Sequence, residues 1–347
     1  MPTIPTDRNP ELDGHCKQVI QELTEGVVVP FLGAGVNLCG RPASRKWTGG
    51  ESSYLPDGRE LARYLAGATQ FRSQTQVECK CGEKVIVETD PDLTRMAQRV
   101  INELGSVRLY RKLREVFDRN YEPTALHMLL AELPRRLAEK GYARYPLIIV
   151  TTNFDDLMER AFELQDPPQP YDVVKYLAKR KDDDAASEKG RGIFWHRPWA
   201  KEERAIVRAN SYLDVPTDLP VILKIHGDID RKSPEGDGDS YVVAEDNYID
   251  YLQHSDVQRL LPVNLVKRMI GSHFLFLGYA LRDWNCRIFL KRIWDKAPGS
   301  TTSWAVQKEP DETDKRYWER HSVQILDYDL ADYVEHLNEA LKKLPPQ

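Results

Sequence analysis

The sequence lacks a long uninterrupted run of apolar residues, and its amino-terminal segment is polar and interrupted by proline. A membrane-spanning helix needs about 20 consecutive apolar residues, so no membrane partner is expected. The amino-terminal segment also lacks the basic start and apolar centre of a secretory signal peptide. We therefore predict a cytoplasmic protein, whose 347 residues provide enough length for one large domain or two modest ones.

Cysteine is scarce, with five residues in the whole chain. Only Cys79 and Cys81 lie close together, and no second pair follows that would complete a four-ligand zinc site. An odd number of cysteines in a cytoplasmic protein does not favour disulfides. We therefore expect neither a bound metal nor a disulfide framework.

An excess of basic charge is also missing, because 49 lysines and arginines are set against 54 acidic residues and the net charge is -5. A protein that coats nucleic acid or an anionic membrane usually carries the opposite balance. The charge of the chain therefore does not indicate nucleic acid as a partner, although a local basic patch stays open.

What the sequence does contain is an alternation of short apolar runs with segments of helical periodicity. Near-continuous apolar runs of this length are typical of strands that are covered on both faces. Their alternation with helices predicts an α/β fold, namely a Rossmann-like, doubly wound and mostly parallel sheet. The predicted strands cover Val27 to Leu32, Leu147 to Val150, Val221 to Ile225, Tyr241 to Val243, His273 to Leu277, Ser303 to Val306 and Val323 to Leu326.

Pro30 conflicts with this pattern, since it lies inside the first apolar run. Proline has no N–H group to donate to a neighbouring strand. We keep the strand prediction and expect Pro30 at a bulge or at a point where strand pairing lapses.

Two segments interrupt the alternation within what we predict to be a single domain of residues 1–347. Residues 54–120 have mainly helical periodicity and predict a helical subdomain between the first two strands of the sheet. Residues 171–216 are mixed in charge and contain an aromatic-rich stretch, which predicts an insertion loop or flap.

The first predicted strand runs directly into a glycine-rich turn, Gly33-Ala34-Gly35, and Asn37 follows two residues later. Glycines allow a close approach of the backbone to a pyrophosphate, and a helix that begins after the turn would favour the anion further. The spacing lacks the third glycine of the full dinucleotide-binding pattern. An alternative therefore remains, in which the glycines only allow a tight turn between the strand and the next helix and bind no ligand.

Three later apolar runs also end in small or polar residues. In a doubly wound sheet the carboxyl ends of the strands meet at one edge, where ligands bind. We therefore predict a common site there. Besides the glycine turn, its candidate residues are Thr152, Asn153, Asp155, His226, Gly278, Tyr279 and Asp283.

Taken together, these segments resemble the SIR2-like family, which is related to sirtuins and is abundant among bacterial antiviral effectors. FLGAGVN (31–37) is similar to the family's nucleotide-binding element, and TTNFDDLMERAF (151–162) resembles its T-x-N-x-D element. KIHGD (224–228) is similar to the His-Gly element, and FLGYALRDWNCR (276–287) to a later family segment. The elements come in family order and span most of the chain.

The resemblance implies NAD as the ligand, and the residue types fit that molecule. Backbone N–H groups of Gly33, Ala34 and Gly35 would contact the diphosphate, with Asn37 nearby. The Asn153 amide could hold a water or a ribose hydroxyl, and the Asp155 carboxylate could accept a hydrogen bond from the nicotinamide carboxamide. The alternative is that Asn153 caps the following helix, with Asp155 as a first-turn acid.

His226 and the last segment have roles under the same resemblance. His226 could take a proton from a ribose hydroxyl or a water near neutral pH, although a lone histidine after a strand is more often structural. Gly278, Tyr279 and Asp283 would close the adenosine side, or their segment could only cap the next helix. His127, on an apolar helix face, is expected to pack in the core.

One departure from the deacylating sirtuins directs the functional prediction, because their four-cysteine zinc module is missing. The resemblance therefore implies that the chain is one of the SIR2-like effectors that hydrolyse NAD to nicotinamide and ADP-ribose. Asn153 and His226 would be its catalytic residues, and no metal would be needed. A non-catalytic module that senses NAD or ADP-ribose stays open, as does an NAD-dependent protein deacylase. The same resemblance implies an abortive antiviral role, a homo-oligomer, and a separate helicase-like or motor ATPase partner.

Overall fold

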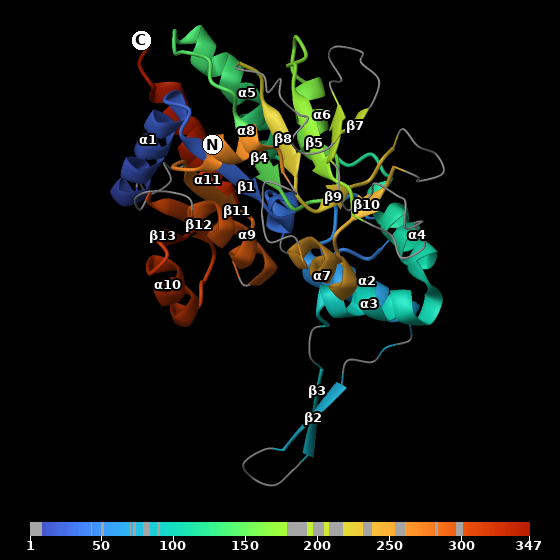
Figure 1. Cartoon of the computed structure of the whole chain (residues 1–347). Helices are drawn as coiled ribbons and strands as arrows, with labels where there is room; N and C mark the ends of the chain where they lie inside the picture. Colours follow the sequence, from blue (N-terminus) through green and yellow to red (C-terminus); the bar gives the residue numbers. More distant parts are fainter. Residues whose placement is uncertain are drawn as a thin grey trace.

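The centre of the molecule is a nine-stranded sheet in the order β13-β12-β11-β1-β4-β8-β5-β6-β7 (Figure 1). The computed structural model describes residues 9–42, 44–49, 52–69, 71, 74–78, 84–88, 91–178, 193–196, 205–207, 218–231, 238–253, 261–281, 284–295 and 301–347. The strands are β1 (Val28–Leu32), β4 (Ile148–Thr151), β5 (Asp172–Tyr176), β6 (Ile193–His196), β7 (Ala205–Val207), β8 (Val221–Lys224), β11 (His273–Leu277), β12 (Ser303–Gln307) and β13 (Val323–Asp327).

The seven strands from β13 to β5 are parallel, whereas β6 and β7 add antiparallel pairs at one edge. The strand order reverses at β1: the chain proceeds to β4 on one side and reaches β11 on the other. These features confirm the prediction of a Rossmann-like, doubly wound α/β fold, in which the crevice lies at the carboxyl ends beside the reversal.

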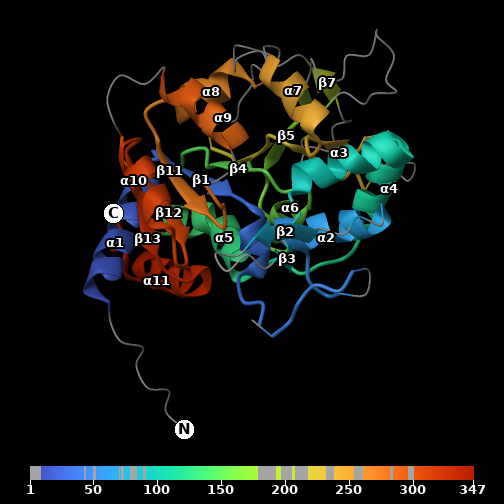
Figure 2. The same cartoon turned by 90° about the horizontal axis from the view of Figure 1, so that it is seen from below.

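Helices cover both faces of the sheet, as Figure 2 shows. Alternate residues of β1 serve the two layers, with Val29 and Phe31 in one core and Val28 and Leu32 in the other. The first layer is formed by α8 (Val263–Met269), α9 (Trp284–Trp294) and α10 (Glu312–Glu319), and the second by α1 (Pro10–Thr24), α5 (Ala125–Glu139), α6 (Leu157–Glu163) and α11 (Leu330–Lys343).

Pro30 lies where strand pairing is incomplete, as expected. β1 pairs with β11 along its whole length, but its pairing with β4 begins only at Phe31. The missing N–H group of Pro30 therefore leaves no gap in a ladder on the β4 side.

The segment 54–120 contains α2 (Gly58–Ala68), α3 (Leu93–Leu104), α4 (Ser106–Phe117) and a hairpin of β2 (Gln74–Glu78) and β3 (Lys84–Glu88). Asp57 starts α2 with a reciprocal capping box to Glu60. The three helices share a core of their own, and Phe154 of the main domain packs into it. A side-chain hydrogen bond of 3.0 Å from Gln98 to Asp246 ties α3 to α7 (Glu245–Gln253).

The predicted insertion at 171–216 begins differently from the expectation, because Asp172–Tyr176 forms β5, a fully buried strand of the sheet. The run DVVKY is so short that its composition does not distinguish it from the polar segment that follows. β6 and β7 also belong to the segment, and most of the rest of it lies outside the described residues. The predicted strand at Tyr241 to Val243 is reduced to β10 (Ser240–Tyr241), which pairs with β9 (Gly227–Asp228) in a separate small sheet.

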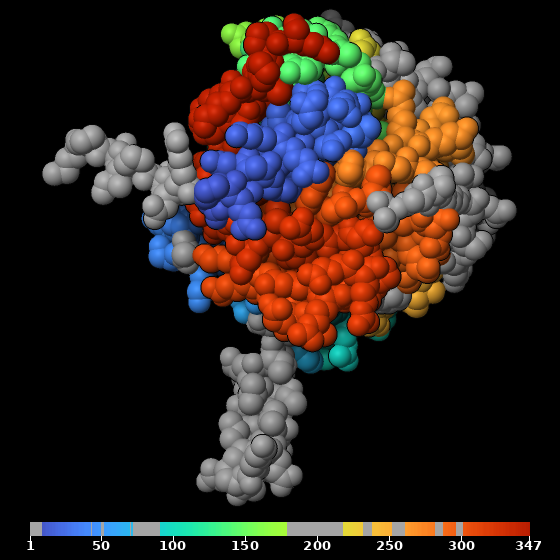
Figure 3. Space-filling view, turned by 90° about the vertical axis from the view of Figure 1, so that its left-hand side faces the viewer, coloured from blue at the N-terminus to red at the C-terminus, as the bar shows by residue number. Residues whose placement is uncertain are grey.

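The first and last helices pack side by side, as Figure 3 shows. His336 of α11 contacts Asp13 of α1 at 2.9 Å, and the Asn9 side chain donates a hydrogen bond to the Tyr328 hydroxyl. These contacts join the two ends of the described chain on one face of the sheet. Within the described residues, no helix has the length and apolar character needed to cross a membrane.

Candidate functional site

The loops after β1, β4, β8 and β11 open into one cavity of about 990 Å³ at the carboxyl edge of the sheet. This volume is at the upper end of the range typical of ligand pockets. Helices α2, α3 and α7 supply the opposite wall (Figure 1). Of the predicted site residues, those that line the cavity are Ala34, Gly35, Asn37, Thr152, Asn153, Asp155, His226, Gly278 and Tyr279.

The glycine turn packs against the loop after β11, and this corrects the role predicted for its N–H groups. The Gly33 N–H donates to the Leu277 carbonyl at 3.1 Å, and the Gly35 N–H donates to the Gly278 carbonyl at 2.8 Å. Added Cβ atoms at Gly33 and Gly35 would lie 2.7 and 2.6 Å from the Gly278 oxygen. These two N–H groups are therefore engaged within the chain, and the glycines permit a close contact between two loops.

The element after this turn is also shorter than the prediction required. Ala34–Leu38 forms only a five-residue 3-10 helix, η1. So short an element provides little aligned dipole for an anion. The periodicity of the sequence after Gly35 does not distinguish such a turn from the start of a full helix.

Asn37, Asp155 and Asn153 form a buried polar group on the cavity wall. The Asn37 side chain donates to Asp155 Oδ2 at 2.9 Å, and the Asn153 side chain donates to the Gly33 carbonyl at 3.2 Å. The Thr152 backbone N–H donates a hydrogen bond to the Leu32 carbonyl at 3.1 Å. The amide oxygens of both asparagines are buried and accept no hydrogen bond within the described chain. Two unsatisfied acceptors in a cavity favour a ligand that carries N–H or O–H donors.

The capping interpretation of this segment is correct only in part. Helix α6 begins at Leu157 with Asp156 as its N-cap, so Asn153 lies outside the helix. Asp155 does accept a hydrogen bond from the Leu157 N–H at 3.2 Å. Asp155 therefore supports the helix start through one oxygen and holds Asn37 through the other.

His226 follows β8 and is 6% exposed on the cavity wall. Its ring lies edge-on to the Tyr248 ring of α7, with 5.4 Å between the ring centroids. Its backbone carbonyl accepts a hydrogen bond from the Val242 N–H at 2.9 Å. Packing thereby orients the ring, and His226 is part of the cavity lining.

Gly278 and Tyr279 directly follow β11 and border the same cavity. The Tyr279 ring lies edge-on to Phe31, with centroids 5.1 Å apart, and its carbonyl accepts a hydrogen bond from Gln307. Asp283 lies outside the described residues, so its predicted contact with the adenosine ribose stays a prediction.

Replacing Gly278 by alanine is expected to destabilise the chain by about 2–4 kcal/mol. Gly278 has a φ of +62°, and an added Cβ would lie 2.5 Å from the carbonyl carbon of Gly35 and still closer to the Val36 nitrogen. Gly271→Ala is the matched control, because Gly271 has a φ of +81° with no atom within 4 Å of the added Cβ. Urea unfolding should therefore show a clearly smaller loss for Gly271→Ala, and equal losses would contradict the clash.

A buried cluster of charged side chains, formed by Lys224, Glu159, Asp228 and Lys175, lies beside the site residues. The sequence analysis did not predict it. The Lys224 ammonium, fully buried on β8, donates to Glu159 Oε1 at 2.6 Å and to the Asp155 carbonyl at 2.7 Å. Asp228 lies 3.3 Å from Lys224 and 2.5 Å from Lys175. The only signal in the sequence is a lysine inside the apolar run VILKI, between two residues that face the core.

Burial and charge have opposite effects on the two main members of this cluster. Burial raises the pKa of the Glu159 carboxyl to about 7, although Lys224 opposes the shift. Burial also opposes the charged form of Lys224, but Glu159 and Asp228 outweigh it and raise the pKa of Lys224 above its ordinary value. Lys224 therefore remains an ammonium that fixes the carbonyl of Asp155 relative to β8.

His127 packs in the core of α5, as predicted, and is 1% exposed. Its Nδ1 accepts a hydrogen bond from the Thr124 N–H at 3.2 Å, which completes a capping box. Burial lowers the pKa of His127 to about 4. The native chain therefore holds the ring neutral in mild acid, where an unfolded chain would protonate it.

This shift predicts an acid-dependent loss of stability. The native chain has a lower His127 pKa than the unfolded chain, whose value is about 6.5. The contribution of His127 to the free energy of unfolding is therefore complete above about pH 6.5 and is lost as the pH falls toward 4. Between about pH 7 and pH 5, His127 should account for a loss on the order of 2 kcal/mol. His127→Gln keeps a residue suited to the capping box and should remove this part of the loss in urea unfolding at both pH values. The same loss in both chains would contradict the assignment.

The fold and the cavity together define a doubly wound α/β protein with a cavity at the reversal of its strand order, the usual position of ligand sites in such folds. Residues 147–326, just over half of the chain, match the sequence profile of the SIR2-like domain. The chain therefore belongs to the SIR2-like family. This membership suggests an NAD-dependent enzyme.

Among solved structures, a Sir2 protein with a deacetylated p53 peptide and 3'-O-acetyl ADP-ribose is similar to the chain at 15% identity. The comparison covers 93% of this chain and 97% of that one, with a TM-score of 0.39. No curated protein matches the sequence.

Proposed function

We propose that the chain is an NAD glycohydrolase that releases nicotinamide and ADP-ribose. The observation that carries this proposal is the meeting of Asn153 and His226 in one cavity, although they follow different strands. The buried, unsatisfied oxygens of Asn37 and Asn153 support it, because NAD offers ribose hydroxyls and a carboxamide as donors. Membership in the SIR2-like family supports NAD as the substrate.

The proposed reaction breaks the bond between the nicotinamide nitrogen and the ribose carbon. The bonding electrons go to the pyridinium nitrogen, so nicotinamide leaves as a neutral molecule while positive charge develops on the ribose. Asn153 positions the water whose oxygen forms the new bond to that carbon, and His226 takes the proton that this water loses. Asp155 holds Asn37 in place and so fixes this wall of the cavity.

Two alternatives share the same cavity. A protein deacylase would consume an acylated lysine in step with each nicotinamide released, and a sensing module would bind NAD and return it unchanged. The test is to follow nicotinamide by chromatography with and without an acetyl-lysine peptide. The proposal predicts release at the same rate in both, with the peptide unchanged. Release that requires the peptide would support the deacylase instead.

The wider role is proposed from the family resemblance of the four sequence elements. We propose a cytoplasmic antiviral effector that acts as a homo-oligomer with a separate helicase-like or motor ATPase partner. Such an effector would have a basal activity alone that assembly increases, because uncontrolled loss of NAD harms the cell that carries it. Light scattering together with the activity assay tests this role. A chain that is strictly monomeric and fully active alone would contradict it.

A further inference from the structure

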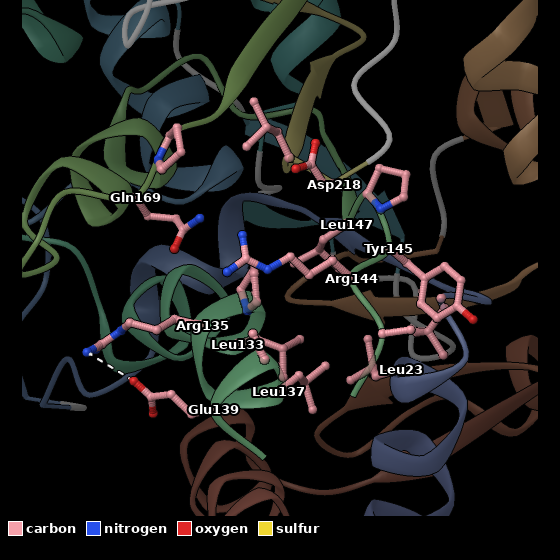
Figure 4. A pocket seen from close by; sticks show the side chains of 18 of the residues that line it. Leu23, Leu133, Arg135, Leu137, Glu139, Arg144, Tyr145, Leu147, Gln169 and Asp218 are labelled. Atoms are coloured by element: carbon pink, nitrogen blue, oxygen red, sulfur yellow. Dashed lines mark ion pairs between the residues drawn. The ribbon is translucent and has the colours of Figure 1, made fainter. Parts of the chain in front are cut away.

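A second cavity, of about 460 Å³, lies at the opposite edge of the sheet, where the strands begin (Figure 4). Val28 opens β1, Leu147 precedes β4 and Leu219 precedes β8, and all three line it. The four residues of β4 span about 13 Å, which separates this cavity from the one at the carboxyl edge. The proposed hydrolysis uses none of its residues.

Apolar side chains form about half of the wall of this cavity. Leu23 from α1 and Leu133 and Leu137 from α5 contribute to it, together with five prolines. Tyr145 lies against Gly26, where an added Cβ would be 2.5 Å from the tyrosine ring. Tyr145 is 47% exposed, so its ring also presents apolar surface to solvent beside the cavity. The volume and lining match those of small-molecule pockets.

Cationic groups are the polar groups best placed to orient a ligand here. Figure 4 shows the Arg144 side chain extended across the middle of the lining residues. Within the described residues, its guanidinium makes no hydrogen bond or ion pair, and the buried Arg135 Nε also lacks a partner. Glu139 is paired with Arg135 at 3.8 Å, and the exposed Asp218 lies above Arg144 in the view.

We propose that this cavity binds a small amphipathic anion, with a flat apolar body against the leucines and prolines and an acidic group on Arg144. A guanidinium binds carboxylate, sulfonate or phosphate oxygens through two parallel hydrogen bonds. Figure 4 shows Arg144 across the middle of the lining, with the Asp218 carboxylate above it, and Glu139 is already paired with Arg135. The Arg144 guanidinium is therefore the charged group that a ligand inside the cavity meets, and it favours an anion. The site is independent of NAD hydrolysis and would be present in an inactive chain.

The test uses 8-anilinonaphthalene-1-sulfonate, a fluorescent aromatic sulfonate, titrated into the full chain. We expect one saturable site, and Arg144→Ala should weaken its affinity about tenfold or more. Ala143→Trp, which fills the cavity from its exposed rim, should also weaken binding by about tenfold or more. Arg111→Ala removes an exposed arginine of α4 outside the cavity and should leave binding unchanged.

Each result decides for or against the proposal. Since Arg144 and Ala143 are exposed, both variants should keep the melting temperature of the unmodified chain. Unchanged dye binding in either variant would overturn the proposal. Displacement of the dye by NAD would also overturn it, because the dye would then occupy the carboxyl-edge cavity. None of these outcomes depends on whether NAD is hydrolysed.

Discussion

His226→Ala is expected to slow the release of nicotinamide from NAD by about 10²–10⁴-fold, the usual contribution of a positioned proton acceptor. The ring lies on the cavity wall and is held there by Tyr248, so its removal takes away the proposed base without a change in the ion cluster beneath. Initial rates at saturating NAD measure the effect. Asn153→Ala should slow the same step, because the attacking water loses its hydrogen-bond partner.

His321→Ala is the matched control for this prediction. His321 follows α10, packs on Tyr317 at the surface and lies outside the cavity. Its replacement should leave the rate unchanged. If His226→Ala kept the full rate while its melting temperature matched the unmodified chain, His226 would have no catalytic role.

Lys224→Met is expected to destabilise the chain by about 3–5 kcal/mol, because it leaves Glu159 buried without its counter-charge, whereas Asp228 keeps Lys175. Glu159 is 13% exposed and Asp228 is 10% exposed, so water cannot replace the ammonium that lies 2.6 and 3.3 Å from them. The loss of the hydrogen bond to the Asp155 carbonyl should also loosen the site loop. Urea unfolding gives the free energy, and NAD affinity reports on the loop.

Lys112→Met provides the comparison with an exposed ion pair. Lys112 lies 2.7 Å from Glu115 on α4, but the side chains are 21% and 45% exposed. Its loss should cost at most about 1 kcal/mol. Adding Glu159→Gln to Lys224→Met should recover part of the stability, since one uncompensated carboxyl is removed. A loss for Lys224→Met as small as that for Lys112→Met would contradict the role of the buried cluster.

Much of the fold could be predicted because strands covered on both faces leave a clear apolar pattern. His273 to Leu277 is predicted as a strand and forms one with the same bounds, and Val221 to Ile225 differs by one residue. β5 was missed because DVVKY contains only two aliphatic residues in a row and its charged residues are satisfied inside the fold. Lys175, for example, is buried against Asp228. Local composition cannot reveal such a partner 53 residues away.

The meeting of the polar site residues in one cavity could also be predicted, but the contacts around it could not. The polar residues at strand ends do meet in one cavity, because parallel strands end at a common edge. The use of Gly33 and Gly35 as partners of the β11 loop depends on a neighbour 243 residues further along the chain, so the sequence favoured an anion-binding role instead. The lining from α7, which includes Tyr248, follows from the tertiary packing of α7 against α3.

Incubation of the purified chain with NAD alone tests the central claim most directly. The account predicts that NAD is consumed and that nicotinamide and ADP-ribose appear in equal amounts without any acyl acceptor. Calorimetry on the same sample establishes whether NAD binds. NAD that binds to the chain and is recovered intact would contradict the proposed hydrolysis and would leave a sensing module as the better description of this cavity.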